Sequence, residues 1–281
     1  MLLLAQAADI GEFEVATIDH GIRAEAKAEC AFVEEVCRDR NIACSIIALQ
    51  VPEGNVQAQA RTARYAALER WASDRGLTAV MTAHHADDQV ETLMMRLNRG
   101  SGVSGLAGVR AATQLGASQM RIVRPLLKFR RSELEAVVSA AGLRAVDDPS
   151  NQDDQFDRVR IRKALADADW HNPLAIARSA QHLADANEAL DYEVDRYWEQ
   201  HCERSGNYIR LPFHPMLETR LRLMTRAIEE LGGSPRGSDV ASLDANLANH
   251  RKSNVAGVMV ELKLEEEGPF LHFSPEPPRS S

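Results

Sequence analysis

The sequence lacks long hydrophobic runs and is poor in aromatic residues. Aromatic residues make up 5% of its 281 residues, and no stretch approaches the roughly 18 consecutive apolar residues that a transmembrane helix needs. The opening MLLLAQAA is apolar over only eight residues and carries no basic residue, so it predicts neither a signal peptide nor a membrane span. With 44% hydrophobic and 26% charged residues, the composition predicts a globular protein without a membrane partner.

Paired cysteines are also absent. The four cysteines form no C-x-x-C pair, which argues against a disulfide framework, a zinc site and an iron–sulfur cluster. They are interpreted as small buried apolar residues, and a reducing, cytoplasmic setting follows. They are Cys30, Cys37, Cys44 and Cys202.

Acidic residues are missing from one long segment. The net charge is −8, with a balance of −1 over residues 1–165 and −7 over residues 166–281. Between Glu91 and Glu133 there is no acid, yet there are eight basic residues. Such a segment is compatible with phosphate or nucleic-acid contact, although a solvated face has the same composition. The eight are Arg96, Arg99, Arg110, Arg121, Arg124, Lys128, Arg130 and Arg131.

The first 150 residues alternate between strand and helix patterns. Strands are predicted at 13–20, 43–51 and 78–84, and each is followed by an amphipathic or Ala-rich helical pattern, at 23–40, 55–76 and 87–98. This order predicts an α/β fold with a doubly wound parallel sheet. Residues 1–165 are assigned to this domain.

Residues 166–281 are predicted to form a second, smaller α+β domain. A long amphipathic helix covers 173–200. It is followed by a strand near 207–212, helices near 216–231 and 238–249, and strands near 255–263 and 269–273.

Polar clusters follow two of the predicted strands. Asp19, His20 and Gly21 end one strand, and His84 and His85 end another. Ligands of parallel α/β sheets bind beyond the carboxyl ends of the strands. Both clusters are therefore expected to face one crevice.

Asp88 and Glu91 begin the helix after His85 and allow two interpretations. Asp88 could be the N-cap, with Glu91 reaching back from the third helical position. Alternatively, two carboxylates beside imidazoles at a helix start could hold Mg²⁺ against phosphate oxygens, or a substrate ammonium. The cap leaves His84, His85 and Asp87 unexplained.

Two groups of arginines are candidates for phosphate contact. Arg61, Arg64 and Tyr65 share one helix face, typical either of an exposed arginine pair or of a phosphate clamp. A second group alternates along a predicted linker helix, so at most two of its members can reach one common anion. Its members are Arg158, Arg160 and Arg162.

Eight short motifs follow one another along the chain: DHGIR (19–23), ARTARY (60–65), HHADDQVET (84–92), RLNRGSG (96–102), GLAG (105–108), RPLL (124–127), DPSN (148–151) and FDRVRIR (156–162). In this order they resemble the motifs of tRNA(Ile)-lysidine synthetase, a PP-loop ATP-pyrophosphatase. The resemblance covers residues 1–165 closely. It is looser over residues 166–281, where the family has its tRNA-recognising segment.

The resemblance implies a two-step ligation on a CAU-anticodon tRNA(Ile). ATP would adenylate the oxygen at C2 of the wobble cytidine and release pyrophosphate. The side-chain amine of L-lysine would then displace AMP, so that the tRNA reads AUA instead of AUG. ATP and Mg²⁺ are the implied cofactors, and a homodimer is left open.

The resemblance also implies roles for individual residues. Asp88 and Glu91 would hold Mg²⁺ and the lysine ammonium, with His84 and Arg61 as further catalytic residues. Asp19, His20, Gly21, Arg23 and His84 would line the nucleotide crevice. Contacts with tRNA or substrate would come from Arg64, Tyr65, Arg99, Ser101, Gly102, Arg124, Arg158, Arg160 and Arg162.

Two departures from the family pattern are visible. The family begins with a strand and an S-G-G-x-D-S loop whose N–H groups cradle pyrophosphate, and MLLLAQAA reads as the helix that should follow it. A start set too late, a fragment or decayed copy, or a variant with a replaced loop would each explain this. In addition, Val159 stands where the family usually has Asn.

Other functions fit parts of the pattern. A metal-dependent phosphohydrolase could use DHG and HHADD, a tRNA thiolase is disfavoured without a C-x-x-C pair, and a truncated remnant could bind tRNA without turnover.

Overall fold

The computed structural model describes residues 1–9, 11–19, 25–49, 56–114, 120–144, 155–250 and 252–276. The chain divides into two compact units, Met1–Ala184 and Asp185–Ser281. The sequence placed the domain boundary near residue 165. The division in space lies later in the chain, because the first twelve residues of the long helix α8 (Pro173–His201) belong to the first unit.

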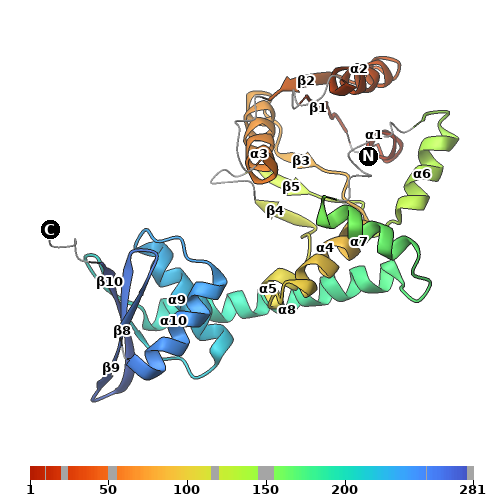
Figure 1. Ribbon diagram of the computed structural model, residues 1–281. Coiled ribbons are helices and arrows are strands. Elements are labelled where there is room, and N and C mark those ends of the chain that lie inside the picture. The colour runs from red at the N-terminus through yellow and green to blue at the C-terminus, as the bar shows by residue number, and fades with distance from the viewer. Residues whose placement is uncertain are drawn as a thin grey trace. The chain divides into compact units, whose positions relative to one another are not determined.

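The first unit alternates helices and short strands, as the sequence predicted (Figure 1). It also contains two elements that the sequence did not predict, the short helix α5 and the strand β4. Before α8, its elements are α1 (Leu2–Ala7), β1 (Val15–Asp19), α2 (Glu25–Arg38), β2 (Cys44–Ala48), α3 (Val56–Asp74), β3 (Ala79–Met81), α4 (Ala86–Asn98), α5 (Val103–Leu106), β4 (Ala112–Gln114), β5 (Arg121–Val123), α6 (Arg131–Ala140) and α7 (Asp157–Ala166).

The strands of the first unit form two sheets. β1 pairs in parallel with β2, whereas β5 lies between β3, with which it is parallel, and the antiparallel β4. The α/β class with parallel pairing is confirmed. Among the described strands, β1 pairs only with β2 and β3 pairs only with β5, so both keep one edge open to a further strand.

One apolar cluster joins the two sheets beneath α3. Leu68 and Ala72 of α3 pack with Val80 of β3 and Ile122 of β5, and Ile18 of β1 packs against this cluster. Both sheets therefore pack against residues of one helix.

The second unit is a five-stranded antiparallel sheet with helices packed on it (Figure 1). Its strand order is β6-β7-β10-β9-β8. Period-two patterns place Ile209, Leu211, Val258 and Val260 in the core, where Trp198 of α8 is also buried. The elements after α8 are β6 (Glu203–Ser205), β7 (Tyr208–Pro212), α9 (Leu217–Glu230), α10 (Gly237–His250), β8 (Lys252–Val255), β9 (Val258–Glu265) and β10 (Gly268–Pro275).

The glycine-rich loop after α4 is held by two side chains of that helix. Gln89, 4% exposed, donates from Nε2 to the Val109 carbonyl at 2.7 Å and accepts from the Val109 N–H at 2.7 Å. Arg96 donates to the carbonyls of Gly105 and Gly108. Gly108 has φ +67°, and a Cβ there would lie 2.5 Å from Gln89 Oε1. The loop thus requires glycine at this position.

We expect Gly108→Ala to destabilise the protein more than Gly100→Ala. Both glycines have φ +67°, but a Cβ at Gly100 would meet nothing within 4 Å. Gly100→Ala should cost about 1 kcal/mol of backbone strain. Gly108→Ala should cost about 2–4 kcal/mol, because Gln89 must also give up its two bonds to Val109. Urea unfolding measures the free energy of unfolding of both variants. Equal losses would contradict the packing of Gly108 against Gln89.

Candidate active site

The start of α4 brings three of the predicted polar residues together. β3 ends at Met81, and Thr82 Oγ1 then hydrogen-bonds His84 Nδ1 at 2.9 Å. His85 has extended backbone angles and precedes the first helical residue, Ala86. The Asp88 carboxylate accepts the His85 N–H at 2.9 Å. The interpretation of Asp88 as the N-cap is therefore wrong, because the helix begins one turn earlier and Asp88 occupies the third position.

Asp87 fastens the start of α4 to the start of α6. Its carboxylate accepts the backbone N–H of Arg131 at 2.7 Å and the Arg130 Nε–H at 3.2 Å. Ala86 N–H also donates to the Phe129 carbonyl at 2.9 Å. The carboxylate lies 3.6 Å from His85 Nδ1. Asp87 was unexplained at the level of sequence, and its structural role is to position the loop before α6 against the site.

The pKa of Asp87 reflects these contacts. Burial raises the pKa of this carboxyl, but hydrogen bonds from Arg131 and Arg130 and the charge of Arg130 outweigh that effect. As a result the pKa lies below its ordinary value.

Glu91 is the most deeply buried acid of the site, with its side chain 4% exposed. Arg162 donates from Nε to Glu91 Oε1 at 2.6 Å and from Nη2 to Oε2 at 3.2 Å. Arg158 donates from Nε to Glu91 Oε2 at 2.6 Å and from Nη2 to Asp88 Oδ1 at 2.9 Å. The hydrogen bond to Glu91 raises the pKa of Arg162 above its ordinary value. Two helices far apart in the sequence, α4 and α7, are joined here.

The third arginine of α7 points elsewhere. Arg160 pairs with Asp157 of its own helix, and Arg99 also donates to Asp157, at 2.7 Å. The prediction that at most two of the three α7 arginines share an anion is confirmed, since Arg158 and Arg162 meet at Glu91. Asp157 was not singled out from the sequence, although its place at the first position of α7 is typical of an acid near a helix N-terminus.

The contacts described above do not connect the other predicted site residues to the cluster of Asp88 and Glu91. Arg124 is 5% exposed and donates to the Arg110 carbonyl at 2.8 Å and to Thr113 Oγ1 at 3.2 Å. It holds β4 to β5 here, and its contact with phosphates stays a prediction. Ser101 N–H donates to the Arg96 carbonyl at 3.0 Å, and Gly102 is the N-cap of α5.

The predicted nucleotide-binding motif is only partly described. Asp19 ends β1, and its carbonyl accepts the Leu49 N–H at 2.8 Å. His20, Gly21 and Arg23 lie outside the described residues, as does the side chain of Arg61. On α3, Arg64 is exposed and Tyr65 packs against the apolar cluster beneath that helix.

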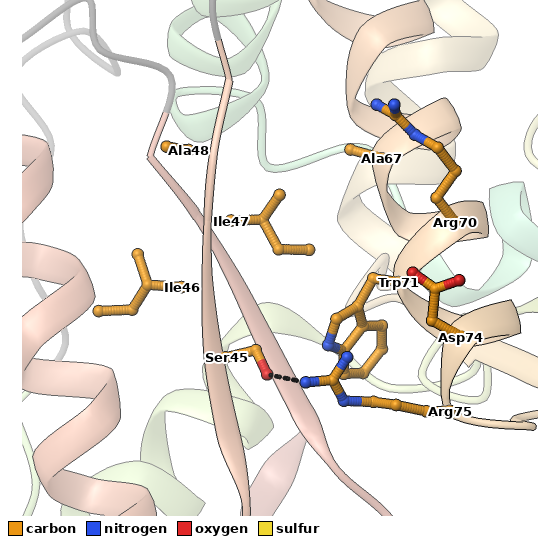
Figure 2. A pocket seen from close by; sticks show the side chains of 9 residues that line it. All are labelled: Ser45, Ile46, Ile47, Ala48, Ala67, Arg70, Trp71, Asp74 and Arg75. Carbon is orange, nitrogen blue, oxygen red and sulfur yellow. Dashed lines mark hydrogen bonds between the residues drawn. The ribbon is translucent and has the colours of Figure 1, made fainter.

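An open hollow of about 640 Å³ lies between β2 and α3. Figure 2 shows Arg75 reaching Ser45 beside the Trp71 ring. Its lining includes Ile47 and Arg70 and none of the predicted site residues. We therefore place the candidate active site at the start of α4 and not in this hollow.

As arranged, the two carboxylates do not fit a divalent cation. Asp88 and Glu91 already carry two guanidinium groups, which balance their charge. Within the described ranges, no group of three or more His, Cys, Asp or Glu side chains could hold a metal ion. A metal at this position would have to take the place of the arginines.

The four cysteines have free thiols, with Cys30 and Cys37 buried and Cys44 and Cys202 partly exposed. Burial is the main reason that the pKa of Cys44 is raised to about 12, so this thiol stays protonated at neutral pH. No described helix is long and apolar enough to cross a membrane.

We expect Glu91→Gln to destabilise the protein by about 1–3 kcal/mol. The change leaves the guanidinium groups of Arg158 and Arg162, whose side chains are 41% and 30% exposed, without the buried charge that they pair with. Glu135→Gln is the matched control, because Glu135 pairs with Arg131 at 2.8 Å on the exposed face of α6. It should cost no more than about 0.5 kcal/mol. Urea unfolding at pH 7 measures the free energy of unfolding of both variants. Similar losses in the two variants would contradict the claim that Glu91 holds α7 to α4.

The lowered pKa of Asp87 predicts a pH-dependent contribution to stability. Because its folded pKa lies below that of the unfolded chain, about 4, Asp87 stabilises the folded state above this pH. The contribution is lost as the pH falls through the folded pKa. The loss of unfolding free energy in Asp87→Asn should therefore be largest at pH 7 and shrink below about pH 4. A loss that stays constant between pH 7 and pH 3 would contradict this account.

Comparisons with known proteins agree with the fold. The family model of the PP-loop domain matches residues 1–168. A solved U34-tRNA thiolase, NcsA from Methanococcus maripaludis with its [4Fe-4S] cluster, superposes with a TM-score of 0.54 at 16% identity. It covers 66% of this chain and 67% of its own, and it shows the fold alone.

Two relatives match nearly the whole chain. The tRNA(Ile)-lysidine synthase of Novosphingobium aromaticivorans is 47% identical over 262 residues, which are 92% of this chain and 80% of the relative. That of Zymomonas mobilis subsp. mobilis is 35% identical over 286 residues, 99% of this chain and 85% of the relative. The chain belongs to the tRNA(Ile)-lysidine synthase family of PP-loop proteins.

Proposed function

We propose that this protein joins L-lysine to C2 of the wobble cytidine of a CAU-anticodon tRNA(Ile) in the cytoplasm. Membership of the lysidine synthase family carries the proposal, together with the acidic pair Asp88 and Glu91 at the start of α4. In the first step the C2 oxygen attacks the α-phosphorus of ATP and pyrophosphate leaves. In the second, the lysine side-chain amine attacks C2, AMP leaves with that oxygen, and the amine loses its proton.

Residues of α4 would receive the amine substrate. An ammonium group requires an anion and hydrogen-bond acceptors in a partly dry site. Asp88 and Glu91 would supply both if the ammonium takes the place of one of their two arginines, and Asp87 keeps the neighbouring loop in place by its bonds to Arg130 and Arg131. His84, which bonds Thr82, would lie on the nucleotide side of the crevice.

ATP would bind beyond the ends of β1 and β3. Asp19 at the end of β1 and His84 after β3 are the described members of that crevice. The open edges of β1 and β3 would admit the additional strand that carries the family's phosphate-binding loop. Mg²⁺ stays a prediction from the resemblance, and no step here depends on it.

The basic segment of the first unit would contact the tRNA through Arg121 and Lys128, which lie on its surface. Arg99 is exposed too, but it pairs with Asp157 at 2.7 Å. In the second unit, which the resemblance gives as the tRNA-recognising segment, six arginines are paired with acids, which lowers their value for phosphate contact. These pairs join Arg196 to Glu193, Arg204 to Glu230, Arg210 to Glu203 and Glu265, Arg220 to Asp244, Arg222 to Asp191 and Glu218, and Arg226 to Asp195.

The alternative to be tested is a tRNA-binding protein without turnover. Such a protein would bind tRNA in a salt-dependent way and release no pyrophosphate.

The test is incorporation of labelled lysine into an unmodified CAU-anticodon tRNA(Ile) transcript, with ATP and Mg²⁺. It should be run on this chain and on a version that carries the phosphate-binding loop upstream. We expect incorporation by the version with the loop, and its loss in Asp88→Asn. No incorporation by either version, with tRNA still bound, would favour the protein without turnover.

A further inference from the structure

The turn between β5 and α6 buries two apolar side chains and leaves a third exposed. Leu126 is 4% exposed and Leu127 is 9% exposed, whereas Phe129 is 44% exposed. The Phe129 N–H donates to the Leu126 carbonyl at 3.0 Å and closes the turn. A single exposed ring is common on protein surfaces, so the surroundings of Phe129 decide whether it can bind a ligand.

The backbone at Phe129 is fixed beside the start of α4. Its carbonyl accepts the N–H of Ala86, the first residue of that helix, at 2.9 Å. The Asp87 carboxylate also holds the backbone N–H of Arg131 at 2.7 Å. Ala86 lies two residues before Asp88, the acid that the proposed function places beside the attacking lysine amine. The turn that carries the Phe129 ring is therefore anchored at the candidate active site.

The charges around Phe129 suit a nucleic acid. Lys128 is exposed, and no acid among the described residues pairs with it. The two arginines after Phe129 each pair with an acid, so Lys128 is the cation of this turn that a phosphate can reach. Trp170 is the contrasting case, because it is 73% exposed but follows Asp167 and Asp169, whose charges repel phosphates. Of these two rings, Phe129 has the surroundings typical of a site for unpaired bases.

We propose that Phe129 stacks on the adenine that follows the wobble cytidine of the CAU anticodon. The inference rests on the proposed function and deepens it by naming how the target base is made accessible. An enzyme that acts on a base must take it out of the stack, at a cost in stacking energy. When the cytidine leaves, the adenine loses a stacking partner, and the Phe129 ring takes that place. Lys128 then meets a phosphate of the same strand.

This contact positions the cytidine and does not choose the tRNA. Every base has a face that can stack on an aromatic ring, so the ring recognises an unstacked base and not its identity. Phe129 is therefore a positioning residue of the reaction. The opposite role is that Phe129 only completes the turn. Its loss would then weaken the binding of every RNA to the same extent.

Fluorescence anisotropy of labelled anticodon stem-loop RNAs with the 281-residue chain tests the proposal without turnover. One RNA carries the CAU anticodon, a second has an abasic nucleotide in place of the adenine, and a third has it in place of the nucleotide before the cytidine. The proteins are wild type, Phe129→Ala, Phe129→Trp and Trp170→Ala. Trp170→Ala is the matched control, because it removes an exposed ring that has acidic neighbours.

We expect Phe129→Ala to weaken binding of the CAU RNA by about 5- to 100-fold, the loss typical of one base stacked on an aromatic ring. The abasic adenine should weaken wild-type binding to a similar extent, and Phe129→Ala should then lose nothing further. Phe129→Trp should restore binding, and Trp170→Ala should leave it unchanged. With the third RNA, Phe129→Ala should still show its full loss.

Several results would overturn the proposal. They are no binding of the CAU RNA by wild type, an undiminished affinity of Phe129→Ala for that RNA, an equal loss with the abasic adenine, and a loss that disappears only with the third RNA. If Phe129→Ala does not fold, Phe129→Leu takes its place, because it keeps an apolar side chain without the ring. Lysine incorporation by the version with the loop, together with any of these results, would refute the stacking contact and leave the proposed function standing.

Discussion

The buried carboxylate of Glu91 is the interaction on which the first unit's site depends. It lies one turn inside α4 and accepts hydrogen bonds from two arginines of α7, a helix nearly 70 residues further along the chain. A buried carboxylate without such partners would be strongly unfavourable. The cost of leaving it unpaired keeps α7 in place and sets the positions of Arg158 and Asp88 at the surface of the site.

A second set of hydrogen bonds holds the neighbouring loops against α4. Asp87 fixes the loop before α6, and Gln89 and Arg96 fix the glycine-rich loop after α4. Asp87, Gln89 and Glu91 of one helix therefore hold three separate segments of the chain. A lysidine synthase must bring ATP, an amine and a tRNA base to one place, and a single rigid helix that organises several segments serves that need.

Much of the fold was predictable from local patterns. The apolar periodicity of α8 and α9 and the alternation in β7 gave elements close to those observed. The split into two sheets and the antiparallel β4 were not predictable, because strand pairing is decided by partners far away in the sequence. In the site, the spacing of Arg158, Arg160 and Arg162 limited a shared anion to at most two of them, but it indicated neither which two nor which anion. That Glu91 is the anion depends on the packing of α4 on α7, which no local pattern encodes. Nothing in the sequence predicts the role of Asp87 except its place in the charged motif HHADDQVET.

A double-mutant cycle between Glu91 and Arg162 tests the central claim most directly. Unfolding free energies would be measured for Glu91→Gln, Arg162→Gln and the double variant. If the buried pair holds α4 to α7, the two losses are strongly non-additive, with a coupling energy of about 1–3 kcal/mol. Additive losses, within about 0.5 kcal/mol, would show that the pair does not hold the helices together and would contradict the account.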